Sequence, residues 1–184
     1  MTYHVPFLKK AYSDSYKLAG AELGVFEGEG AVRLCNQLQF SILYLVDPYL
    51  LHKGYDGYSG YDQAEWNNIE ERMKKALHID DTGIGVCNGQ RVKHLKMMSV
   101  DAAKTIDDAA LDFVYIDANH AYEYVKLDLE TWYDKVKPGG WVMGHDWPYP
   151  TVQQAVNEFM AARNIHFHPD SGQLHGTHDW WFRR

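Results

Sequence analysis

Cysteine is scarce in this chain. Cys35 and Cys87 are the two cysteines among 184 residues, and their positions match no metal-ligand spacing. A secreted, disulfide-stapled fold needs a larger set of cysteines. The sequence therefore argues against a disulfide scaffold and a cysteine-based metal site, and we expect two small, partly buried thiols.

Long hydrophobic runs are also lacking. The longest apolar segments, such as residues 42–46, have the length of a strand, whereas a membrane-spanning helix needs about 20 apolar residues. The first ten residues contain no apolar core of the kind found in a signal peptide. We expect no membrane segment and a cytoplasmic protein.

An excess of positive charge is absent as well. The chain has 18 Lys and Arg residues against 25 Asp and Glu residues, which gives a formal net charge of −7. Proteins that bind the phosphate backbone of nucleic acids usually carry a basic face. We therefore expect a small-molecule ligand and no nucleic-acid partner.

What the sequence does contain is a regular alternation of strand and helix patterns. Strand patterns cover residues 18–25, 42–46, 91–98, 111–116 and 141–144, and helix patterns cover residues 30–39, 63–77, 102–106, 122–136 and 152–162. Two closing strands, residues 165–168 and 178–182, have no helix between them. This order predicts a single α/β domain over residues 1–184, with a Rossmann-like, doubly wound, mostly parallel sheet and an antiparallel edge strand at the C-terminus.

Polar residues and glycines gather where these strands end. Gly24 lies at the end of the first strand, Asp47 ends the second, Asp117 follows residues 111–116, and His145 and Asp146 follow residues 141–144. The carboxyl ends of parallel strands meet at one edge of the sheet, which is where ligands bind in open α/β folds. The sequence therefore predicts a ligand site at this edge.

The glycine spacing limits the class of ligand that the site is expected to bind. Glycines after the first strand let a ligand approach the backbone, and an acid about 20 residues downstream is placed to bind ribose hydroxyls. Here Gly24, Gly28 and Gly30 differ from the G-x-G-x-x-G dinucleotide pattern, and Glu22 precedes them. An acidic loop favours a cofactor with an amino-acid end and a positive sulfonium. A tight turn beside a solvated acid is the structural alternative.

Four segments resemble the motifs of class I S-adenosylmethionine-dependent methyltransferases. They are AELGVFEGEG at residues 21–30, YLVDP at residues 44–48, DFVYIDANHAYE at residues 112–123 and KPGGWVMGHDW at residues 137–147. The last two are similar to a bacterial and phage group with I-D-G-x-H-x-Y and G-H-D-[YW] patterns. That group is related to O-methyltransferases of sugars and catechol-like substrates, so the resemblance implies methylation of a small-molecule or glycan hydroxyl.

The resemblance also implies roles for single residues in binding S-adenosylmethionine. Gly24 and Gly28 would flank its methionine end, and Asp47 would hold the ribose. Met98 and Ser99 would lie beside the adenine, although Met98 stands where the family more often has an acid. Glu22 and Asp117 complete the expected set of cofactor-binding residues.

Transfer of a methyl group to oxygen requires loss of the hydroxyl proton, for which histidine is the natural base. His120, three residues after Asp117, and His145 are the expected catalytic residues. By resemblance to metal-dependent relatives, Asp117, His145 and Asp146 would hold a divalent cation such as Mg²⁺. The alternatives are structural: His120 would bond to its own turn, and His145 with Asp146 would close the strand end.

Other readings stay open at this point. A nicotinamide-dependent oxidoreductase or a non-catalytic cofactor-binding module would use the same fold. Because few residues precede the first strand, we expect an acceptor site that is open to a glycan end or bulky molecule, or one completed by a homo-oligomer. The tyrosine-rich loop at residues 54–61 is a candidate lid or a plain solvated loop.

Overall fold

The computed structural model describes residues 4–51, 60–165, 172–173 and 178–184 of the chain. The strands are β1 (Leu18–Leu23), β2 (Phe40–Val46), β3 (Ile84–Cys87), β4 (Gln90–Leu95), β5 (Leu111–Ile116), β6 (Val136–Gly144), β7 (Gly172–Gln173) and β8 (Trp180–Arg183). The helices are α1 (His4–Ala11), α2 (Glu29–Gln37), α3 (Gln63–Ala76), α4 (Ser99–Ala103), α5 (Tyr122–Trp132) and α6 (Pro150–Ala162).

The described strands form one sheet in the order β3-β4-β2-β1-β5-β6-β8-β7. Five neighbouring strands, β4, β2, β1, β5 and β6, run parallel. The strand order reverses between β1 and β5, which is the switch point where α/β sheets open a crevice. The expected Rossmann-like fold is confirmed, and β8 pairs antiparallel with β6 as its C-terminal edge.

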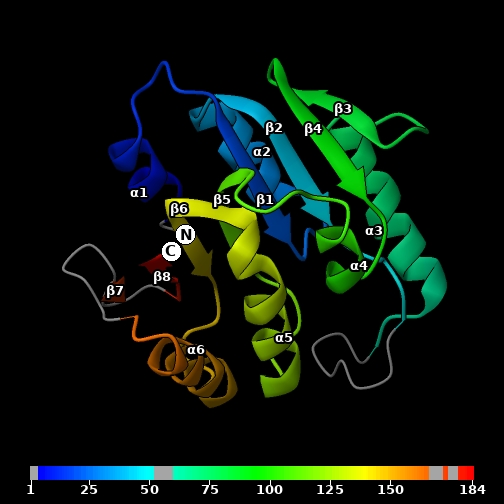
Figure 1. The fold of residues 1–184 in the computed structure, drawn as a ribbon. Helices are drawn as coiled ribbons and strands as arrows, with labels where there is room; N and C mark the ends of the chain where they lie inside the picture. Colours follow the sequence, from blue (N-terminus) through cyan, green and yellow to red (C-terminus); the bar gives the residue numbers. More distant parts are fainter. Residues whose placement is uncertain (1–3, 52–59, 166–171, 174–177) are drawn as a thin grey trace.

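Helices cover both faces of this sheet (Figure 1). Strand side chains alternate between the two faces. In β5, for example, Phe113 and Tyr115 pack in the core cluster that includes α2 and α3, whereas Val114 and Ile116 pack in the cluster that includes α4, α5 and α6. This alternation produces the two hydrophobic layers that hold the sheet in place.

Several boundaries differ from the sequence prediction. The predicted strand at residues 91–98 ends at Leu95, so α4 begins at Ser99 and not at residue 102. The helix predicted for residues 122–136 ends at Trp132, and β6 then runs through Pro138 with a register irregularity against β5. Helix α6 begins at Pro150, two residues before the predicted start; Tyr149 occupies its cap position, and the Thr151 hydroxyl donates to the His120 carbonyl.

Three of the described strands and α-helices escaped the sequence prediction altogether. One is the two-residue strand β7, which pairs antiparallel with β8. The short strand β3 pairs antiparallel with β4, which gives the sheet a second antiparallel edge. Helix α1 packs Leu8 into the core ahead of β1. The predicted lid loop lies mostly, and the strand at residues 165–168 almost wholly, outside the described residues. Within the described part of the chain, no helix is long and apolar enough to cross a membrane.

Candidate active site

Backbone hydrogen bonds bring the four predicted strand-end clusters together. The amide of Gly24 donates to Val46 O, that of Asp117 to Leu23 O, and that of His145 to Ile116 O. Gly24, Asp117 and His145 therefore each lie one residue beyond the end of a strand, namely β1, β5 and β6 in that order. Asp47 lies one residue beyond the end of β2. The side chains that follow these strands share one edge of the sheet, as the sequence predicts.

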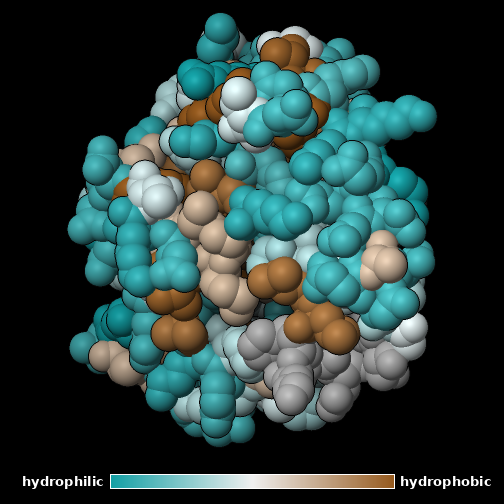
Figure 2. Space-filling model, turned by 90° about the vertical axis from the view of Figure 1, so that its right-hand side faces the viewer, coloured by the Kyte–Doolittle hydropathy of each residue, from teal (hydrophilic) through white to brown (hydrophobic). Residues whose placement is uncertain are grey.

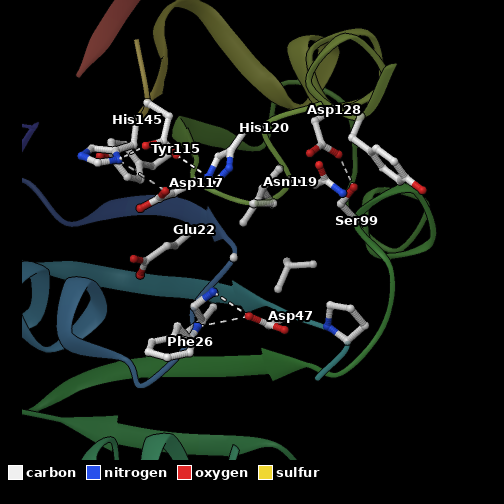
Figure 3. Close-up of a pocket in the computed structure, with 18 of the residues that line it drawn as sticks. Glu22, Phe26, Asp47, Ser99, Tyr115, Asp117, Asn119, His120, Asp128 and His145 are labelled. Atoms are coloured by element: carbon white, nitrogen blue, oxygen red, sulfur yellow. Dashed lines mark hydrogen bonds and ion pairs between the residues drawn. The ribbon is translucent and has the colours of Figure 1, made fainter. Parts of the chain in front are cut away.

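A cavity of about 1120 Å³ opens at this edge. Of the ten predicted site residues, nine line it: Glu22, Gly24, Asp47, Met98, Ser99, Asp117, His120, His145 and Asp146. Figure 3 shows Asp117, His120 and His145 on one side of it, Ser99 and Asp128 on another, and Glu22 and Asp47 below them. Single-ligand sites have volumes of about 300–1,000 Å³, so this cavity has room for a cofactor and an acceptor together.

The glycines divide into two groups. Gly24 has a φ of 80°, and a Cβ there would lie 2.1 Å from the Asp117 carbonyl oxygen. Gly30 lines the cavity, and a Cβ there would lie 2.2 Å from Glu22 Oε1. Gly28, which was predicted to flank the cofactor, caps α2, and a Cβ there would approach Met73 of α3 and Leu77, which follows that helix. Gly28 lies outside the cavity lining, to which Gly30 belongs.

Asp47 links the loop after β1 to the segment after β2 by accepting hydrogen bonds from the backbone amides of both. Its Oδ2 accepts hydrogen bonds from the amides of Val25 (2.9 Å) and Phe26 (3.1 Å), and its Oδ1 accepts one from Tyr49 N (2.9 Å). The Tyr49 hydroxyl donates in turn to Phe26 O at 2.6 Å. Burial raises the pKa of Asp47, although the three amides oppose that shift. A carboxylate has about four acceptor positions, so Asp47 retains capacity for a further donor.

Glu22 is a buried acid that forms no ion pair with another described residue, although the charge of Arg33 partly offsets its burial. Its Oε2 is buried and has no hydrogen-bond partner among the described residues. Burial, reinforced by repulsion from Asp117 and Asp47, raises the pKa of Glu22 to about 8. A buried carboxylate is costly unless something donates to it, so Glu22 is prepared for a cationic or N–H-bearing group in the cavity.

Two histidines share the carboxylate of Asp146. His120 Nε2 lies 2.6 Å from Asp146 Oδ2, and His145 Nδ1 lies 3.0 Å from Asp146 Oδ1 and 3.7 Å from Asp117 Oδ1. The His120 ring stacks on the half-exposed Tyr149 ring, with 4.9 Å between centroids and 8° between planes. Asp146 has a φ of 62°, in the left-handed region that Asp and Asn tolerate. The result is a continuous His–Asp–His chain on the cavity wall.

This chain shifts the pKa values of its members in opposite directions. The hydrogen bond to Asp146 raises the pKa of His120. Burial lowers the pKa of His145, but Asp146 and Asp117 outweigh it, so that the net shift is upward. Burial opposes ionisation of Asp146, yet the two histidines hold its pKa well below the usual value. Burial raises the pKa of Asp117 to about 6, against the attraction of His145. The site therefore stabilises protonated histidine beside ionised Asp146.

The same side chains contain donors suited to a metal ion. Ligand atoms of Asp117, His120 and Asp146 lie within 4.8 Å of one another, as do those of His145, Asp146 and His178. Asp146 belongs to both groups. Of the predicted ligand set, Asp117, His145 and Asp146 are thus neighbours, and the structure adds His120 and His178 as further candidate donors.

Asp128 is a site residue that the sequence analysis missed. It lies in α5, is 4% exposed and lines the cavity, where the hydroxyl of Ser99 donates to its Oδ1. Burial raises its pKa to about 6. Its position was detectable, because Asp128 lies on the helix face marked by Val125, Leu129 and Trp132. An acid on the apolar face of a helix is the signal.

A family model described as a methyltransferase domain matches residues 21–147, which contain most of this cavity wall. The chain belongs to this methyltransferase family. The resemblance to class I S-adenosylmethionine-dependent methyltransferases is thereby confirmed for family and fold. Roles assigned to single motif residues remain predictions.

Several known proteins resemble this methyltransferase. An uncharacterized protein, R132, of Acanthamoeba polyphaga mimivirus is 27% identical over 153 residues, which are 78% of this chain and 60% of that protein. The chain thus spans about three-fifths of the length of this curated relative. The O-methyltransferase NovP superposes with a TM-score of 0.65 at 20% identity, covering 98% of this chain and 76% of that chain. An rRNA methylase from Streptococcus thermophilus gives 0.58 at 10% identity, covering 97% and 90%. At these identities the two structures show a shared fold.

The cavity of this methyltransferase fits S-adenosylmethionine, the cofactor that the family implies. Glu22 offers a buried oxygen without a partner in the described part of the chain, where an ammonium group would be satisfied. Gly24 and Gly30 leave the wall free of side chains at the places where Cβ atoms would collide with neighbouring groups. Asp47, next to Glu22 in Figure 3, has the remaining acceptor capacity that a ribose hydroxyl requires.

Proposed function

We propose that this protein is an S-adenosylmethionine-dependent O-methyltransferase that acts on a hydroxyl group of a neutral small molecule or glycan end. The observation that carries this proposal is the His120–Asp146–His145 chain, which lines the same cavity as the residues that we assign to the cofactor. Cofactor binding alone does not require two histidines held around one carboxylate. Removal of a proton from an acceptor does require such a group.

The cofactor end of the cavity binds and orients. Glu22 would receive the ammonium group of the methionine portion, Asp47 a ribose hydroxyl, and Ser99 with Met98 would lie beside the adenine. When bound, S-adenosylmethionine supplies a methyl group activated by a positive sulfur. Holding an acceptor in line with that group supplies much of the rate acceleration by itself.

The acceptor end handles the proton. His120 would take the proton of the acceptor hydroxyl as the oxygen bonds to the methyl carbon and the carbon–sulfur bond breaks, with S-adenosylhomocysteine as the leaving group, and Asp146 would stabilise the imidazolium that results. This is the orienting and charge-stabilising role that a carboxylate plays beside a catalytic histidine. His145, bonded to the other oxygen of Asp146, would hold the carboxylate in place. The raised pKa of His120 agrees with a site built to hold that proton.

A divalent cation is the alternative way to ionise the hydroxyl. Asp117, Asp146 and a neighbouring histidine would hold it, and it would act there as a Lewis acid on the acceptor oxygen. Aspartate oxygens suit Mg²⁺, and the histidine nitrogens suit Mn²⁺ or Zn²⁺ better. The dependence of turnover on added cations and on a chelator separates this version from the metal-free one.

The rim of the cavity supports a neutral acceptor with an apolar portion. Its lining has seven acidic side chains and one arginine, Arg33, among the described residues. Five of the large hydrophobic side chains that are exposed to solvent also line it: Leu50, Leu51, Met98, Leu127 and Tyr149. Figure 2 shows groups of hydrophobic surface amid hydrophilic surface on one face of the molecule. Phosphorylated acceptors and nucleic acid fit an acidic cavity poorly.

Calorimetric titration with S-adenosylmethionine and S-adenosylhomocysteine, with and without Mg²⁺, is the first test. We expect micromolar binding of both, and weaker binding to Glu22→Gln. NADH serves as the comparison ligand, because binding of NADH alone would favour a nicotinamide oxidoreductase. Failure to bind either sulfur ligand would overturn the proposal.

Transfer of a labelled methyl group to a panel of phenols, monosaccharides and oligosaccharide ends is the second test. General-base catalysis contributes about 10²–10⁴-fold, so His120→Asn should lose at least a hundredfold in kcat while S-adenosylhomocysteine still binds. His78→Asn, which changes an exposed histidine after α3, is the matched control. Full turnover by His120→Asn would remove His120 as the base, and absence of transfer to every acceptor would favour a non-catalytic binding module.

A further inference from the structure

Asp128 has a charge that the fold does not explain. It is almost completely buried in the middle of α5, and the partner that the described residues give it is a neutral hydroxyl, Ser99 Oγ. Joining α4 to α5 needs only a hydroxyl and a neutral acceptor, such as an amide. A buried carboxylate carries a desolvation penalty that a single neutral donor does not offset, so a purely structural role would be served better by asparagine.

The position of Asp128 indicates which part of a ligand it meets. Ser99 and Asp128 lie together on the side of the cavity away from Asp117 and His145, with Asp47 and Glu22 on the floor of the view (Figure 3). Met98 and Leu127, both partly exposed and both in the lining, immediately precede Ser99 and Asp128 in the sequence. A carboxylate acceptor with apolar side chains beside it matches a flat heteroaromatic base that carries an amino group.

The geometry points to Asp128 as the residue that reads the base of the cofactor, by accepting a hydrogen bond from the exocyclic amino group of adenine. The inference rests on the proposed S-adenosylmethionine cofactor. Ser99 is the positioning residue, since its hydroxyl fixes Oδ1 and leaves Oδ2 for the ligand. A base with a carbonyl oxygen in place of the amino group would face the carboxylate with a second acceptor and be rejected.

The test compares two ligands that differ at this one group. S-adenosylhomocysteine carries the amino group, and S-inosylhomocysteine carries a carbonyl oxygen instead. A site built around a hydrogen bond discriminates strongly against an analogue that lacks it, so calorimetry on the wild-type protein should show a preference for the adenine ligand of about 10- to 100-fold. Asp128→Asn should reduce that preference to less than about threefold or reverse it, because an amide also donates to the carbonyl oxygen.

Glu130→Gln, which removes an exposed carboxylate from the same helix, should keep the wild-type preference. Binding of S-adenosylhomocysteine with an unchanged preference in Asp128→Asn would overturn this inference and leave the proposed function standing. Absence of binding of both ligands to the wild-type protein would overturn the proposed function itself.

A measurement on the wild-type protein tests the inference even if Asp128→Asn does not fold. Protonated Asp128 donates where the carboxylate accepts, so the preference for the adenine ligand should shrink as the pH falls from 7.5 to 5. A preference that stays constant over that range would count against Asp128 as the base-reading residue.

Discussion

Asp47 and Asp146 follow parallel strands at the same edge of the sheet, yet they bind different kinds of partner. Asp47 accepts three hydrogen bonds from backbone amides, those of Val25, Phe26 and Tyr49. Asp146 lies between the side chains of His120 and His145. Residue type and topological position are shared, and the difference lies in what each carboxylate holds.

That difference appears in their acidities. Burial raises the pKa of Asp47 because backbone amides compensate only part of the lost hydration. Burial also opposes ionisation of Asp146, but two histidines that can carry positive charge reverse the outcome and lower its pKa. A carboxylate held by amides fixes the shape of a loop, whereas one held by titratable rings fixes where a proton resides. Backbone amides thus hold Asp47, in the proposed cofactor part of the cavity, whereas side chains hold Asp146, in the proposed acceptor part.

Replacing Asp146 by asparagine should have the largest effect, and mainly on turnover. Asparagine tolerates the positive φ at this position but cannot stabilise an imidazolium, so we expect kcat to fall about 10²–10⁴-fold. The unfolding free energy should fall by about 1–2 kcal/mol, because asparagine keeps one acceptor for a histidine but loses the charge that both histidines contact. Initial-rate assays and urea unfolding of the same preparation measure both quantities. If the loss in unfolding free energy were as large as the loss in turnover expressed as a free energy, Asp146 would not differ from Asp47 in its role.

Replacing Asp47 by alanine should instead affect binding and stability. Three amides lose their acceptor, which we expect to lower the unfolding free energy by about 2–4 kcal/mol and to weaken S-adenosylhomocysteine about a hundredfold by releasing both loops. Asp80→Ala is the matched control, because Asp80 also accepts from backbone amides, those of Thr82 and Ile84, in an exposed loop. Cofactor affinity should survive in Asp80→Ala. Near-normal affinity in Asp47→Ala would show that the loops hold their shape without it.

These two acids also show what the sequence could and could not predict. Asp47, Asp117, His145 and Asp146 were predictable because an apolar strand that stops at a polar residue places that residue at a known edge. The sequence did not predict that Asp47 binds backbone amides, because two of the three, those of Val25 and Phe26, belong to a distant loop whose path depends on the fold.

The missed elements have similar causes. Strand β3 is four residues long and partly exposed, so its hydrophobic pattern is too short to recognise. The helix predicted to end at residue 136 stops earlier, and the chain at Pro138 is already in β6, where the Gly139 amide donates to Arg184 O and the Arg184 amide donates to Gly140 O. Gly28 was assigned by spacing to the cofactor because spacing alone cannot tell which face of a turn meets α3 and which meets the cavity.

The pH dependence of cofactor binding tests the proposed role of Glu22, the second acid at the cofactor end of the cavity. The pKa of Glu22 is raised to about 8, with burial as the main cause, so much of it is protonated at pH 7 before a cation binds. Affinity for S-adenosylhomocysteine should therefore rise about tenfold between pH 6.5 and 8 and then level off. Glu22→Gln should flatten this profile. Glu29→Gln, which changes an exposed side chain on the same cavity, should leave it unchanged, and a flat wild-type profile would contradict the role of Glu22.

The smallest effect concerns the stability of the ligand-free protein. The pKa of Asp128 is about 6 in the folded protein, against 3.8 for an ordinary aspartate, with burial as the first cause. Between these values the folded state holds a proton that the unfolded state has released, so stability falls as the pH rises through this window and stays lower above it. Asp128→Asn removes this penalty and should raise the unfolding free energy at pH 8 by about 1 kcal/mol, less than the full shift implies because the bond from Ser99 weakens. Urea unfolding at pH 8 and pH 5 measures the difference, and a variant that is less stable at pH 8 would show that the Asp128 charge serves the fold.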